Sequence, residues 1–213
     1  MRWRVGLFCT GKQEDVAGCH ARLSWVVQAR LSPEGQKTAK ILGNRLKYIF
    51  GQCQIFGSSP LLRAQETAWL VMDAFNIPVE KYGDHIYYDH GFWSYNPEIW
   101  RSGANSNEAI FNVLSHFVRQ DGRSLLMTVE KLILLIPSEE SQAIVISHKG
   151  PVDAAIMMAK KSLGCKDDTL GSCKDGEGVI LTYEREVTGS LHLVKLEEVS
   201  EATPCEQTGP AQV

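Results

Sequence analysis

Short apolar segments alternate with amphipathic helical patterns along most of this chain, and that alternation limits the folds open to it. The expected strands are residues 4–9, 53–57, 143–146, 178–183 and 190–196. The expected helices are residues 33–49, 60–75, 107–119, 123–136 and 151–160, and Ser32 and Ser59 are the expected caps at the start of the first two. The last two strands flank a Thr-Gly turn and are expected to pair antiparallel. The whole pattern predicts an α/β fold, a three-layer α/β/α sandwich with a mostly parallel central sheet.

Length and composition favour one domain of residues 1–198 followed by a polar, disordered tail of residues 199–213. A net charge of -3 gives no reason to expect nucleic acid or an acidic membrane as partner. No apolar run is long enough to span a bilayer, and the first residues lack the pattern of a signal peptide. The six cysteines form no Cys-x-x-Cys pair, so we expect no metal, no cofactor and a cytoplasmic protein with free thiols.

Three polar segments follow expected strands, where open α/β sheets bind their ligands. The turn at Gly11 follows the first strand, Ser58-Ser-Pro with Arg63 follows the second, and His148 follows the third. An arginine in the first turns of a helix offers a planar fork for phosphate oxygens. Arg63 is equally compatible with the surface of a plain capped helix, and His148 with a hydrogen-bonded core histidine.

The order of these segments resembles the histidine phosphatase superfamily, the phosphoglycerate-mutase-like enzymes. The resemblance implies that Arg63, His148 and Gly11 belong to a phosphate-binding site. In that family the first turn reads Arg-His-Gly, and its histidine accepts the phosphoryl group. Here Cys9 and Thr10 stand in place of the arginine and of the catalytic histidine. A threonine hydroxyl is a far weaker nucleophile than a neutral imidazole.

The general acid of the family is also missing from its expected place. Many relatives carry a glutamate a few residues before a Gly-x-Trp, and Tyr87 falls at that position here. Asp89 is the candidate acid, with Glu80 as a weaker choice, because a shifted loop would bring either carboxyl close to a leaving group. His90 precedes a glycine, as the catalytic histidine of the family does. Its position in the chain order is wrong for that nucleophile, so we expect His90 to line the pocket instead.

These substitutions favour a catalytically impaired protein, a pseudoenzyme, that binds phosphate as part of a phosphorylated small molecule or protein. One alternative is an active phosphomonoesterase that uses Cys9, His90 or water as substitute nucleophile. A strand-end cysteine is more often buried, so we prefer a structural role for Cys9. Another alternative is a non-catalytic interaction module that has lost its phosphate affinity. Residues 12–30 and 79–106 are expected to shape the ligand-binding site, and their sequence does not indicate which ligand it takes.

Overall fold

The computed structural model of this protein describes residues 2–14, 29–53, 55–59, 61–77, 142–165, 173–187 and 189–201, together with Leu126 and Glu130. The strands are β1 (Arg2–Cys9), β2 (Ile55–Ser58), β3 (Gln142–Ser147), β4 (Gly178–Arg185) and β5 (Leu191–Val199). The helices with given bounds are α2 (Pro33–Phe50), α3 (Leu62–Ala74) and α7 (Lys149–Ser162). The α/β fold predicted from the sequence is therefore confirmed.

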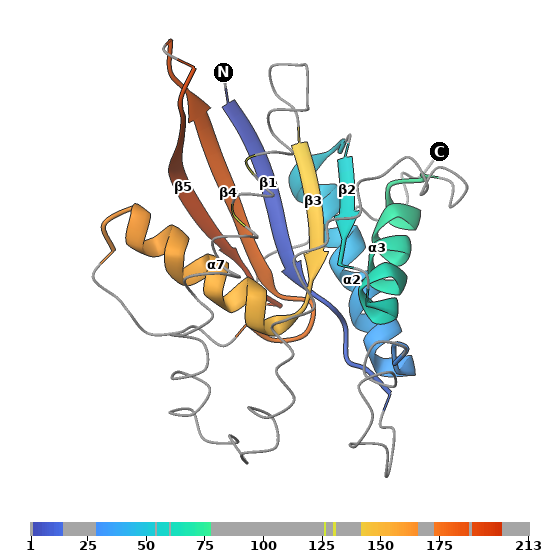
Figure 1. Cartoon of the computed structure of the whole chain (residues 1–213). Helices are drawn as coiled ribbons and strands as arrows, with labels where there is room; N and C mark the ends of the chain where they lie inside the picture. Colours follow the sequence, from blue (N-terminus) through green and yellow to red (C-terminus); the bar gives the residue numbers. More distant parts are fainter. Residues whose placement is uncertain are drawn as a thin grey trace, which may run out of the picture.

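The described strands form a mixed sheet in the order β2-β3-β1-β4-β5. The neighbours β2, β3 and β1 pair parallel, whereas β4 pairs antiparallel with β1 and β5 antiparallel with β4. The expectation of a mostly parallel sheet is thus only partly met, and the expected antiparallel pairing of the last two strands is confirmed. The arrowheads of β1, β2 and β3 all point to the same edge of the sheet (Figure 1).

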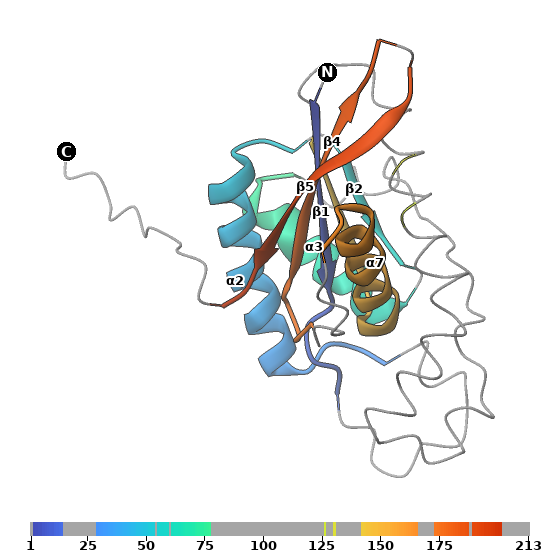
Figure 2. The same ribbon diagram turned by 90° about the vertical axis from the view of Figure 1, so that its left-hand side faces the viewer.

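Side chains alternate between the two faces of the sheet, and each face packs on helices. Val5, Leu7 and Cys9 of β1 share one buried cluster with residues of α7, whereas Phe8 belongs to a second cluster with residues of α2 and α3. Figure 2 shows α2 and α7 on opposite sides of the sheet. This arrangement is the three-layer sandwich that the sequence predicts.

Helix α2 begins as its sequence predicts, and α3 does not. Ser32 caps α2, because its hydroxyl accepts a hydrogen bond from the N–H of Gly35 at 3.0 Å. A serine was also expected to cap the next helix, but the N-cap of α3 is Leu61, which has no side-chain capping bond. The N–H of Ser59 instead donates to the carbonyl of Ile146 at 2.9 Å and continues the β2–β3 pairing, so α3 starts later.

Several predictions fall outside the described residues. They concern the helices at 107–119 and 123–136 (apart from Leu126 and Glu130, which are helical), most of the loop at 12–30, and the segment 79–106. The division into a domain of residues 1–198 and a tail stays a prediction, although β5 continues to Val199. In the part of the chain that the structure describes, no helix has the length and apolar character needed to cross a membrane.

Candidate anion site at the carboxyl edge of the sheet

The carboxyl ends of β1 and β3 bring the turn after the first strand next to His148. Cys9 is the strand partner of Ser147, and the N–H of Thr10 donates to the carbonyl of Ser147 at 2.8 Å. His148 follows Ser147 as the N-cap residue of α7, and it is half-buried. Thr10 itself is buried, with 6% of its surface exposed. The sheet thus places Thr10 and His148 side by side at one edge, as their positions after parallel strands predict.

The turn at Gly11 is held by close backbone contacts. A Cβ atom at Gly11 would lie 2.5 Å from the carbonyl oxygen of Gly35, and one at Gly35 would lie 2.1 Å from that of Lys12. The N–H of Ser32 also donates to the carbonyl of Lys12 at 2.9 Å. The turn after β1 therefore packs directly against the first turn of α2, and only glycine fits at both contact positions.

Arg63 lies in the first turn of α3 and is 6% exposed. One side chain connects its helix with the turn after β1. The hydroxyl of Thr67 donates to the carbonyl of Arg63 at 2.7 Å and accepts the N–H of Gly11 at 3.2 Å. Arginine is rarely so buried unless its charge is compensated. Arg63 is therefore not the surface arginine that was the alternative considered from the sequence.

A loop before β4 closes another side of the Thr10 turn. The N–H of Gly176 donates to the carbonyl of Thr10 at 3.2 Å, and the N–H of Cys9 donates to the carbonyl of Glu177 at 2.9 Å. Asp175 of this loop is exposed, and partial desolvation raises the pKa of its carboxyl. Lys149, the first residue of α7, opposes that shift.

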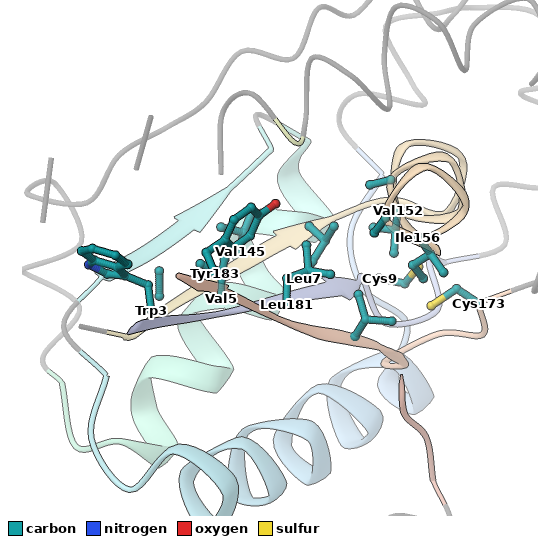
Figure 3. Packing of buried hydrophobic residues seen from close by; sticks show 14 residues of the cluster. Trp3, Val5, Leu7, Cys9, Val145, Val152, Ile156, Cys173, Leu181 and Tyr183 are labelled. Carbon is teal, nitrogen blue, oxygen red and sulfur yellow. The ribbon is translucent and has the colours of Figure 1, made fainter. Parts of the chain in front are cut away.

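Cys9 faces away from the edge and into the core. Its side chain is 2% exposed and lies beside Cys173 under Val152 and Ile156 of α7 (Figure 3). A hydrogen bond between the two thiols and the burial of the site raise the pKa of Cys9 well above its ordinary value. Because the thiolate is the nucleophilic form, these surroundings make Cys9 an inert structural residue. This agrees with the interpretation preferred from the sequence.

The remaining sequence-predicted residues cannot be placed. Asp89, the candidate acid, and also Tyr87, Glu80 and His90 lie outside the described residues. Within the described ranges, no group of three or more histidine, cysteine or acidic side chains is arranged to hold a metal ion.

The structure adds residues that sequence reasoning did not single out. Lys12 directly follows Gly11, and Lys149 directly follows His148. These positions next to the motif residues could have identified both lysines from the sequence. Thr67 and Asp175 carry no local motif, since their relation to the edge depends on contacts made far along the chain.

Comparison with known proteins assigns the chain to a family. The profile of the histidine phosphatase superfamily (branch 1) matches residues 18–184, so the chain belongs to that superfamily. The match begins beyond the Cys9-Thr10-Gly11 turn. Among the curated proteins, no sequence matches this chain.

Solved structures of phosphatases share the fold at low sequence identity. The mycobacterial glucosyl-3-phosphoglycerate phosphatase is 14% identical with a TM-score of 0.62, and the match covers 92% of this chain and 97% of the other. The α-ribazole phosphatase from Shigella flexneri is 16% identical with a TM-score of 0.52, over 91% and 95% of the two chains. At such identities the likeness defines a phosphoglycerate-mutase-like fold.

Proposed function

We propose that this protein is a catalytically impaired histidine phosphatase that keeps a phosphate-binding site for a phosphorylated small molecule or protein. The site is built from Arg63, His148 and the turn at Gly11. The observation that carries the proposal is the burial of Arg63 at the start of α3, beside the turn after β1. A buried guanidinium at the carboxyl edge of a sheet is well suited to bind the oxygens of a phosphate group.

The residues at the expected position of the phosphoryl acceptor support impairment. Thr10 supplies a hydroxyl in place of an imidazole, and Cys9 is buried against Cys173 with its pKa raised. Neither side chain presents an activated nucleophile. The free thiols of the described cysteines fit a reducing compartment, so we expect the protein to act in the cytoplasm.

An assay on a generic aryl phosphate tests the impairment. We expect no turnover above the uncatalysed rate by the purified protein, although vanadate or phosphate raises its melting temperature. Turnover that Arg63→Ala abolishes would show an active phosphomonoesterase instead. No turnover together with no thermal shift would favour an interaction module without phosphate affinity.

A further inference from the structure

The loop Cys173–Glu177 carries a carboxylate to the proposed anion site. Its backbone is fixed at the Thr10 turn by the bonds from Gly176 to Thr10 and from Cys9 to Glu177. The loop is also tied to α7, because the N–H of Cys173 donates to the Asp153 carboxylate at 2.8 Å. Asp175 precedes Gly176, so the fold holds its side chain beside the turn.

Positive groups from three elements lie close enough to Asp175 to act on its charge. They are Lys149 of α7, Lys12 after β1 and Arg63 of α3, and each favours the ionised carboxylate. Glu34 of α2 has the opposite influence and is bonded to Lys12, with Nζ and Oε2 2.8 Å apart. The cations around Asp175 are therefore tied to the proposed site. Arg63 belongs to it, Lys12 follows Gly11 and Lys149 follows His148.

We propose that Asp175 is a specificity-determining residue of this anion site, and that it selects ligands by their charge. This inference depends on the proposed function. An ionised Asp175 neutralises part of the positive charge and repels a dianion. In the acidic range where Asp175 titrates, a dianion therefore binds together with a proton that Asp175 takes from solvent, and at higher pH it binds more weakly beside the ionised carboxylate. A monoanionic ligand, such as a phosphodiester, binds without that proton.

Two negative charges a few ångströms apart near a protein surface repel strongly enough to change a binding constant by about tenfold or more. Partial desolvation already raises the pKa of Asp175, so the free energy needed to protonate it is smaller than for a fully solvated aspartate. No covalent bond of the ligand is formed or broken in this step.

Sulfate is a suitable probe because it stays a dianion through the whole pH range of the experiment, and perrhenate is a tetrahedral monoanion of similar shape. Calorimetric titration of both anions compares the wild type with Asp175→Asn at about pH 5 and about pH 8. At about pH 8 we expect the variant to bind sulfate about tenfold more tightly, with a much smaller change for perrhenate. Titration at about pH 5 in two buffers of different ionisation enthalpy should show more proton uptake in the wild type than in Asp175→Asn.

Two controls isolate Asp175. Glu184→Gln removes the same charge at the opposite edge of the sheet, where Glu184 bonds to Arg2, and should leave sulfate affinity unchanged. Proton uptake that persists in Asp175→Asn measures what a histidine of the site contributes, and the difference between the two proteins is assigned to Asp175.

The outcomes separate this inference from the proposed function. Sulfate binding of equal strength by the wild type and Asp175→Asn would overturn the inference and leave the anion site standing. Absence of sulfate binding in both proteins at both pH values would overturn the anion site itself and the inference with it. Binding by the variant alone would support both.

Discussion

The backbone N–H of Gly11 donates to the hydroxyl of Thr67 at 3.2 Å, and the same hydroxyl donates to the carbonyl of Arg63. Thr67 is completely buried. One side chain of α3 thus connects the turn after β1 with the arginine proposed to bind phosphate. Any shift of that turn relative to α3 has to break one of these bonds.

Replacement of Thr67 by valine keeps the shape of the side chain and removes both bonds. We expect Thr67→Val to lower the free energy of unfolding by about 1–3 kcal/mol, because a buried N–H at Gly11 loses its acceptor. Anion affinity should fall as well, since Arg63 and the turn lose their common support. Urea unfolding and calorimetry measure the two effects. Thr67→Ser keeps the hydroxyl and serves as the control, and a valine variant as stable as the wild type would contradict this account.

The contact of the turn with α2 predicts an unusual response to alanine. Glycine-to-alanine changes inside helices ordinarily stabilise by about 0.5–1 kcal/mol. At Gly35 the new methyl would lie 2.1 Å from the carbonyl oxygen of Lys12, so we expect Gly35→Ala to destabilise by more than about 2 kcal/mol. At Gly150 of α7 nothing lies within 4 Å, and Gly150→Ala should be neutral or stabilising. Thermal unfolding of both variants checks the contrast, which equal melting temperatures would refute.

A buried carboxylate predicts how stability depends on pH. Asp153 of α7 is 5% exposed, and desolvation raises its pKa to about 6 from an ordinary 3.8. The folded state therefore holds this proton more tightly than the unfolded chain does. Protonation of Asp153 thus adds about 3 kcal/mol to the free energy of unfolding. This contribution is complete below about pH 4, and it is lost as the pH rises through about 6.

Asp153→Asn should remove that contribution, because an amide oxygen still accepts the N–H of Cys173 and carries no charge. We expect the variant to be more stable than the wild type by about 1–3 kcal/mol above about pH 7, with the difference vanishing near about pH 4. Asp73→Asn, at an exposed position of α3, is the matched control. A constant difference across the pH range would show that the charge of Asp153 is not responsible.

The surroundings of Cys9 predict its reactivity. Cys165 is exposed, whereas the free thiol of Cys9 is buried beside that of Cys173, and its pKa is raised. In the native protein we expect iodoacetamide to alkylate Cys165 at least about tenfold faster than Cys9. Peptide mass spectrometry after timed labelling distinguishes the cysteines, and labelling in denaturant shows that both can react. Rapid alkylation of native Cys9 would restore it as a candidate nucleophile.

Much of the fold could be predicted because strands and helices leave local patterns. The apolar runs at 4–9 and 143–146 became β1 and β3 with bounds one or two residues longer, and Ser32 caps α2 as expected. The direction in which the strands pair was harder to predict. Both β3 and β4 are apolar enough to be central strands, so their composition does not tell which neighbour of β1 runs antiparallel.

The candidate site was predicted only where its residues belong to a motif. Arg63 and His148 follow strands in a recognisable order, and the sheet brings their elements to one edge. The bond between Thr67 and Gly11 joins residues 56 positions apart, and a threonine inside a helix gives no sign of it. The hydrogen bonds that hold the Asp175 loop at this edge likewise arise from the return of the chain at β4, which local sequence does not encode.

The central claim is that a buried Arg63 binds phosphate at this edge, and calorimetric titration with inorganic phosphate tests it most directly. We predict measurable binding by the wild type and a loss of about 10- to 100-fold with Arg63→Ala, because the charged hydrogen bonds to the anion are removed. Arg45→Ala is the control, since Arg45 is a similarly buried arginine that donates to the carbonyl of Glu201 after β5. It should retain wild-type affinity. Equal phosphate affinity in the wild type and Arg63→Ala, or no binding by the folded wild type, would contradict the account.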